Sequence, residues 1–284
     1  MRIFNIIFIT ILFITYSCKR QAEDKKGLKL NKKEKGLVVY QLKQQDSFDK
    51  QIKSVDEYVK SKGGIAGSLD YSKSDGSSFQ SFANLDKNGQ FIRVDENFFD
   101  AKSGARGQRF FYIRDEKFFA CKELIQEDSR NASDPLLERI SYFSKEGYCL
   151  KTKQRAFNVS DENNNLPFTS VALRSYSIEN ALNAINRKNG FRLAFKGFIE
   201  ARQGRYIEVG EPGSNRYSSV LKVDDNDPFI KEVLKDQFRY LNASIYLTFE
   251  TISESNGFLY QHLLKAAWSK ESLDEKLKTD SKIN

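Results

Sequence analysis

The chain has few of the residues on which most enzyme and metal centres depend. Its 284 residues include one histidine, three cysteines, four prolines, one methionine and one tryptophan. A single histidine excludes multi-histidine metal sites and most histidine-based mechanisms. That residue, His262, alternates with apolar residues, so we interpret it as structural. The chain also lacks a G-x-S-x-G elbow, a P-loop and a G-x-G-x-x-G loop, so we expect no cofactor and no metal.

Long apolar runs are also scarce, and the one that exists lies at the start of the chain. Residues 3–14 are almost wholly apolar, and Arg2 precedes them. A membrane-spanning helix needs about 20 apolar residues to cross a hydrocarbon core of roughly 30 Å, so this run is too short. A basic start, a short apolar stretch and a polar end before Cys18 predict a secretory signal peptide over residues 1–17.

The position of Cys18 gives this signal a more specific meaning. With Cys18 directly after Ser17, residues 1–20 resemble the lipobox of bacterial lipoproteins, although Thr15 and Tyr16 stand where that family usually has Leu and Ala. The resemblance implies that Cys18 is lipidated on its sulfur and becomes the acylated amino terminus. Because two or more acyl chains anchor a protein stably, we expect a lipid-anchored protein of the cell envelope, in the outer membrane.

The overall composition predicts a folded, basic protein. Its 23 Phe and 13 Tyr supply bulky core residues that a disordered chain would lack. The formal net charge is +8, and much of the excess lies in residues 18–45, which we interpret as a lysine-rich tether. A basic run beside an anchor is typical of a solvated linker that attracts an anionic membrane surface. A nucleic-acid partner is disfavoured, because the chain carries an export signal.

Residues 46–158 are predicted to form a helix followed by an antiparallel sheet. Phe48, Ile52, Val55 and Val59 recur at helical spacing over residues 47–61. About six short strands follow without an intervening helix, beginning with a hairpin at Asn88-Gly89, and tight turns make such strands antiparallel. We expect the helix to cover one face of this sheet, which makes the fold class α+β.

The polar stretch 159–167 predicts a boundary before a second part, residues 168–268. Apolar residues from Ile178 to Ile185 indicate a helix that ends at Gly190. Three strands, a helix over 228–241 capped by Asp227, and two more strands then follow. This order resembles an OB-type barrel, so we expect a five-stranded OB-like barrel here. Residues 269–284 are expected to form a flexible tail.

Two kinds of residue could carry a function in these parts. Exposed cations and an aromatic side chain on the predicted outer face of the barrel suit a sugar or phosphate ligand, although an ordinary solvated sheet face would show the same pattern. These residues are Arg192, Lys196, Arg202, Tyr206 and Arg216. Paired carboxylates could instead catalyse glycoside hydrolysis. The available carboxylates are Asp70, Asp95, Glu96, Glu123, Glu200, Glu208 and Glu250.

Side-chain alternation places Cys121 on an apolar face and Cys149 on a lysine-bearing face. We therefore expect no disulfide between them. The absence of a nucleophile, a metal set and a cofactor loop favours a non-enzymatic envelope lipoprotein that binds a protein, a glycan or the cell wall. The alternatives are a carboxylate-dependent hydrolase of envelope polysaccharide and an inhibitor or immunity lipoprotein.

The anchor can be tested directly. Replacing Cys18→Ser removes the sulfur that would be lipidated, so we expect an unprocessed precursor without incorporation of a fatty-acid probe in producing cells. A Cys121→Ser variant should be processed and labelled normally. Labelling and cleavage before residue 18 in the Cys18→Ser protein would contradict the lipoprotein interpretation.

Overall fold

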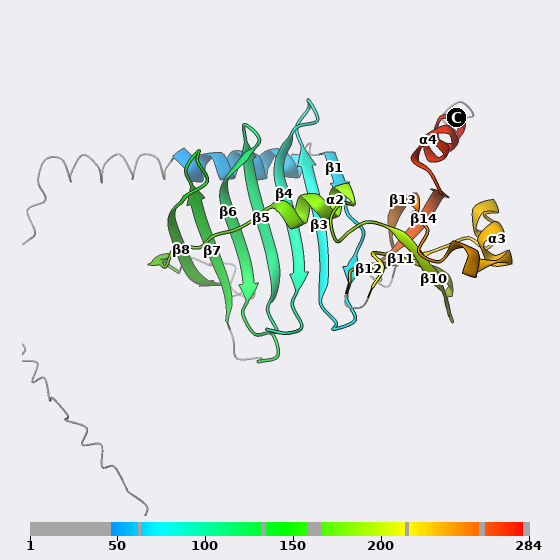
Figure 1. The fold of residues 1–284 in the computed structure, drawn as a ribbon. Helices are drawn as coiled ribbons and strands as arrows, with labels where there is room; N and C mark the ends of the chain where they lie inside the picture. Colours follow the sequence, from blue (N-terminus) through cyan, green and yellow to red (C-terminus); the bar gives the residue numbers. More distant parts are fainter. Residues whose placement is uncertain are drawn as a thin grey trace, which may run out of the picture. The chain divides into compact units, whose positions relative to one another are not determined.

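The protein is a mixed α+β structure dominated by one large, open antiparallel sheet (Figure 1). The computed structural model describes residues 47–61, 64–131, 135–157, 166–213, 216–255 and 259–280. The predicted signal peptide, tether and Cys18 lie outside the described residues, as does most of the predicted boundary. The predicted α+β class is confirmed.

The sheet is built mainly by strands that pair with their neighbours in sequence. Its order is β10-β11-β12-β2-β3-β4-β5-β6-β7-β8-β9, with β1 paired to β3 and β14 paired to β12 and β13. The strands are β1 (Gly64–Gly67), β2 (Tyr71–Ser72), β3 (Ser78–Leu85), β4 (Phe91–Phe99), β5 (Arg106–Arg114), β6 (Lys117–Gln126), β7 (Leu136–Phe143), β8 (Cys149–Phe157), β9 (Thr169–Val171), β10 (Ala194–Ala201), β11 (Gly204–Gly210), β12 (Ser218–Lys222), β13 (Tyr246–Ser253) and β14 (Leu259–Ala267). The helical segments are residues 47–61, α2 (Glu179–Asn186), α3 (Pro228–Lys235), the 3-10 helix η1 (Gln237–Tyr240) and α4 (Lys270–Asp280).

Tight turns create the meander from β3 to β8. In the β3–β4 turn, Asp86 Oδ1 accepts a hydrogen bond from the backbone N–H of Asn88 at 2.8 Å, and Gly89 has a φ of 77°. The two-residue β5–β6 turn consists of Asp115 and Glu116, with φ values of 51° and 62°. Such turns require positive φ, which residues other than glycine adopt rarely. Hairpin turns alternate between the two ends of the strands in a meander. The β3–β4, β5–β6 and β7–β8 turns therefore lie at the same end of the strands.

The N-terminal helix, residues 47–61, covers the back face of the sheet, as predicted (Figure 1). The Phe48 ring stacks 5.9 Å from the rings of both Phe119 and Tyr142. Its neighbours Ile52 and Val55 pack in the same apolar cluster. One apolar stripe of a helix therefore lies on the apolar rows of β5 to β7.

Two aspartates fix this helix to the sheet. Asp49 accepts a hydrogen bond from the Tyr142 hydroxyl at 2.5 Å. Two turns further along, Asp56 accepts from Arg93 Nη1 at 2.8 Å and from the Tyr112 hydroxyl at 3.0 Å. The helix is thus held by directional bonds as well as by apolar contact.

The opposite, front face of the sheet is covered by α2. Ala181 and Ala184 are buried, and Leu182 packs against the same core cluster. The helix ends at Asn186, because Arg187 adopts the left-handed conformation with φ 54° and ψ 46°. The prediction that this helix continues to a Gly190 stop is therefore wrong.

The closed five-stranded barrel predicted for the C-terminal part is not supported. These strands belong to the large open sheet, and β12 pairs on one side with β2 through Ser218 and Ser72. In the described chain, β12 pairs with β14 at one position, Lys222 and His262. Residues 193–195 meet the segment before β13 through the Ala194–Ser244 bridge and three backbone hydrogen bonds. The element order was read correctly, but order does not determine whether strands close. One row of apolar side chains on β11, β12 and the residue after β12 is nevertheless buried: Ile207, Val209, Leu221 and Val223.

Two other C-terminal elements differ from the expectation. The side chain of Asp227 caps α3 by accepting hydrogen bonds from the N–H groups of Phe229 and Ile230, as predicted. The helix then breaks at Asp236 instead of continuing to residue 241, which leaves Phe238 77% exposed. Residues expected to form a flexible tail form α4, which buries Leu273.

We expect the Asp56 contacts to contribute measurably to stability. An Asp56→Ala variant leaves Arg93 and Tyr112 without this partner, so the free energy of unfolding should fall by about 1–3 kcal/mol. The neighbouring Glu57→Ala variant removes an exposed carboxylate and should change it by less than about 0.5 kcal/mol. Urea unfolding measures both. Equal effects would contradict the role given to Asp56.

Candidate functional site

The five residues predicted as a binding face are spread along the C-terminal strands, and two are paired with carboxylates. Arg192 Nη2 lies 2.8 Å from Glu211 Oε1, and Lys196 Nζ lies 3.0 Å from Glu208 Oε1. These ion pairs reduce the positive charge that the sequence alone suggested for this face.

The other three residues occupy separate positions. Arg202 lies in the turn between β10 and β11, Tyr206 on β11 stands opposite Lys222, and Arg216 precedes β12. Regular alternation from Lys196 would also place Phe198 on the outer face, but a β-bulge after Phe195 turns Phe198 toward the core. A bulge inserts one residue into the alternation, so every later side chain changes face.

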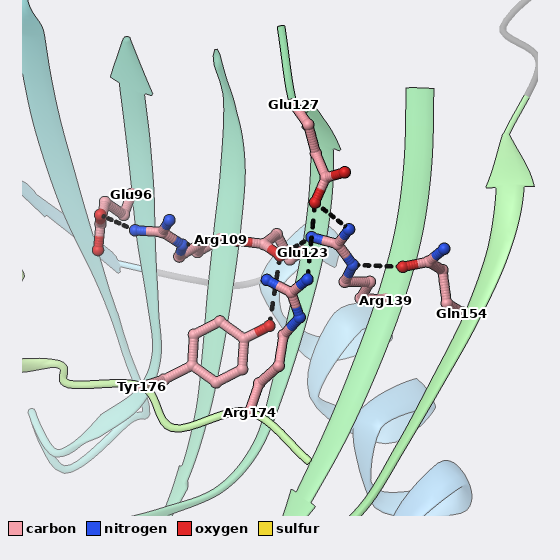
Figure 2. A network of polar contacts seen from close by, with 8 residues as sticks. All are labelled: Glu96, Arg109, Glu123, Glu127, Arg139, Gln154, Arg174 and Tyr176. Carbon is pink, nitrogen blue, oxygen red and sulfur yellow. Dashed lines mark hydrogen bonds and ion pairs between the residues drawn. The ribbon is translucent and has the colours of Figure 1, made fainter. Parts of the chain in front are cut away.

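The most organised group of polar side chains lies elsewhere, on the front face of the meander. The strand register places Glu96, Arg109, Glu123, Arg139 and Gln154 directly opposite one another on β4 to β8. We call this cross-strand row the ladder (Figure 2). Opposite charges therefore alternate across four strands, and an amide ends the row.

Every step of the ladder is a direct contact. Arg109 donates from Nη1 to Glu96 at 2.9 Å and from Nε to Glu123 at 2.8 Å. Arg139 donates to the other oxygen of Glu123 at 3.2 Å and from Nε to Gln154 at 2.5 Å. Each arginine thus binds acceptors on both adjacent strands, and Arg139 also donates from Nη2 to Glu127 at 2.5 Å. This geometry suits the planar fork of a guanidinium group.

Three members of the ladder are almost fully buried, and this burial determines their electrostatics. Glu96, Glu123 and Arg139 are only 4%, 2% and 2% exposed. Burial raises the pKa of Glu96 despite the neighbouring guanidinium. Burial opposes the charge of Arg109, but Glu96 and Glu123 raise the pKa of that guanidinium. Ions in such surroundings are tolerated only when their partners are in place.

A half-open cavity of about 460 Å³ lies in front of the ladder. Its outer wall is residues 172–178, which run without regular structure from β9 to α2 and which we call the strap (Figure 1). From the strap, the Tyr176 hydroxyl donates to Glu123 at 3.3 Å, and Arg174 Nη2 lies 3.6 Å from Glu127 (Figure 2). We call this space the ladder cavity.

A larger hollow lies at the edge where the three hairpin turns meet the start of α2. This hairpin groove has a volume of about 1060 Å³. Its apolar lining residues are Phe91, Ile92, Ile113, Phe118, Ile178 and Leu182. Its charged lining residues are Arg114, Asp115, Glu116, Lys117, Lys145 and Glu146. An apolar floor with a mixed charged rim is the usual anatomy of a protein interface.

The described residues include two cysteines and the single histidine. Cys121 and Cys149 are both free thiols, as expected, but both pack in the front-face core, so the prediction of opposite faces is wrong. A register shift after Tyr142 accounts for the difference. His262 Nδ1 lies 3.6 Å from Glu250. No group of three metal-ligating side chains forms within the described ranges.

Comparison with known proteins adds no relative. The chain matches no protein-family model, no curated protein and no solved structure. In the described part of the chain, none of the helices combines the length and apolar character needed to cross a bilayer.

Sequence reasoning missed the ladder, although its residues carry a signal. Each of four successive strands carries a charged ladder residue, for example Glu123 beside Lys122 in CKELIQ and Arg139 beside Glu138 in LLERISYF. The signs of these residues alternate from strand to strand. Only the register shows that they face one another, because a shift of one residue would move each to the other face.

We expect Glu123 to be essential for the stability of this face. A Glu123→Gln variant leaves Arg109 and Arg139 without their shared counter-charge, and breaking a buried pair costs about 3–5 kcal/mol. Glu200→Gln is the matched control, since Glu200 also pairs with an arginine but is exposed; it should cost about 0–1 kcal/mol. The free energy of unfolding in urea distinguishes them. A small decrease in the free energy of unfolding, equal in both variants, would show that the ladder does not stabilise this face.

Proposed function

We propose that this protein is a lipid-anchored lipoprotein of the cell envelope, expected in the outer membrane, that binds a partner protein and is not an enzyme. The observation that carries the proposal is the hairpin groove. Its volume is about 1060 Å³, and its floor holds apolar side chains from three strands and α2. Anchoring through Cys18 would attach the protein to the membrane.

The charges around the groove favour a protein over an acidic polymer. The rim carries three basic and three acidic side chains. Four of them lie in the β5–β6 and β7–β8 turns, and Arg114 and Lys117 flank the first of these turns. A phosphate-rich or uronic-acid polymer would meet as much repulsion as attraction there. A protein segment with apolar anchors and charges of both signs complements such a rim.

The C-terminal strands support a second, finer part of this proposal. β10, β11 and β12 form a meander, β14 runs parallel to β12 at the Lys222–His262 pair, and Ala194 bridges Ser244. This is the strand order of an OB-like arrangement. In that arrangement the predicted face around Lys196 and Tyr206 would provide an additional contact surface.

A carboxylate-dependent hydrolase is the alternative, and one observation favours it. The raised pKa of Glu96 is a property of a general acid. Arg109 lies between Glu96 and Glu123, however, and binds both. It fills the space that a scissile bond would need between two catalytic carboxylates. New reducing ends released from envelope polysaccharide, and lost in Glu96→Gln, would support the hydrolase instead.

The groove can be tested by crosslinking in producing cells. A photo-crosslinking phenylalanine analogue at position 91 places the reactive group in the groove, because Phe91 is 37% exposed and lines it. The same analogue at position 238 is the matched control, since Phe238 is exposed and lies outside the groove lining. We expect one discrete protein adduct from position 91 that position 238 does not give.

A second variant connects the adduct to binding. Leu182→Lys introduces a charge into the groove floor, so the adduct from position 91 should fall several-fold while circular dichroism stays unchanged. A partner that is a toxin or an enzyme would identify an inhibitor or immunity lipoprotein. Adducts of the same identity from both positions, or adducts to polysaccharide alone, would contradict the proposal of a protein partner.

A further inference from the structure

The ladder cavity contains more hydrogen-bond donors than its own acceptors use. Two arginines, Arg109 and Arg174, line it against one carboxylate, Glu123. Both oxygens of Glu123 are already occupied, by Arg109 on one and by Arg139 and Tyr176 on the other. The Glu123 carboxylate in the cavity is therefore already bound by Arg109, Arg139 and Tyr176.

The two arginines keep donors that the ladder does not use. Arg109 donates from Nε and Nη1, and its Nη2 donates no hydrogen bond to any described residue. Arg174 is 45% exposed, and its contact with Glu127 is 3.6 Å, longer than a hydrogen bond. Its planar fork of N–H groups is therefore open to a further acceptor.

The strap adds neutral donors beside these cations. Between residues 173 and 177, no backbone N–H donates a hydrogen bond to another described residue. The hydroxyl of Ser175 has no partner within the described chain either, and Ser175 and Ser177 both line the cavity. Backbone N–H groups, hydroxyls and guanidinium groups are the donors that proteins use to hold phosphate and carboxylate groups.

We propose that the ladder cavity binds a small oxyanion, a carboxylate or phosphate group, held by Arg174 and Arg109 with donors of the strap. The size of the cavity, about 460 Å³, admits such a group and a small part of the molecule that carries it. A cation is disfavoured because no free carboxylate oxygen of Glu123 remains to bind it. This site does not depend on the hairpin groove or on the proposed partner.

Binding can be measured on the full-length protein purified in a non-ionic detergent. Isothermal titration calorimetry with inorganic phosphate and, separately, with acetate, at constant ionic strength set with sodium chloride, tests the two chemistries. Saturable binding of phosphate alone assigns a phosphate group, binding of acetate alone assigns a carboxylate, and binding of both assigns a general oxyanion site. Each of these three outcomes supports the proposal. If neither phosphate nor acetate binds, the proposal is overturned.

Variants of Arg174 determine whether any binding occurs in this cavity. Arg174→Gln should raise the Kd about tenfold, because a charge-assisted, bidentate contact is lost. Arg174→Lys keeps the charge without the fork and should give an intermediate Kd. Arg239→Gln is the control, since it removes one exposed cation from η1, far along the chain from the strap and outside every site described above. An equal loss in Arg174→Gln and Arg239→Gln, or no loss in Arg174→Gln, overturns the assignment to this cavity.

Discussion

The shared carboxylate of Glu123 is the interaction on which the front face depends. It lies between two arginines on the neighbouring strands and also accepts the hydroxyl of Tyr176. In a nearly dry environment, each of these ions is tolerated only because the next is in place. The contact with Tyr176 extends the same network to the strap, which leads into α2. The Glu123 side chain therefore connects three neighbouring strands to one another and to the strap that lies over their front face.

The alternation of charge also makes the strand register specific. Sliding β6 by two residues relative to its neighbours would keep Glu123 on the same face but move it away from Arg109 and Arg139. Apolar rows alone tolerate such slips, because one buried aliphatic or aromatic residue replaces another. The ladder makes a slipped register costly, since it would leave unpaired charges buried. Buried ions here specify the pairing in addition to any stability they contribute.

The local elements could be predicted from the sequence, but contacts that depend on register could not. The spacing of Phe48, Ile52 and Val55 was sufficient to predict a helix that covers the sheet. The Asn88-Gly89 turn likewise predicted its hairpin. Single-residue irregularities caused the errors: the bulge beside Gly197 reversed Phe198, and the shift after Tyr142 moved Cys149 to the other face. The ladder and both hollows required the paired strands, because their residues come from segments far apart in sequence.

The attachment of the N-terminal helix has a mechanical consequence for the proposed anchor. This helix follows the predicted tether directly in sequence, so tension on a membrane anchor would enter the fold at its first turn. There Asp49 contacts Tyr142 on β7 and Lys153 on β8, and the helix lies across several strands. A force along the helix axis would load the contacts between the helix and these strands at the same time, in shear. It would not separate the strands one after another. The front face, with the ladder and its cavity, lies on the opposite side from this load.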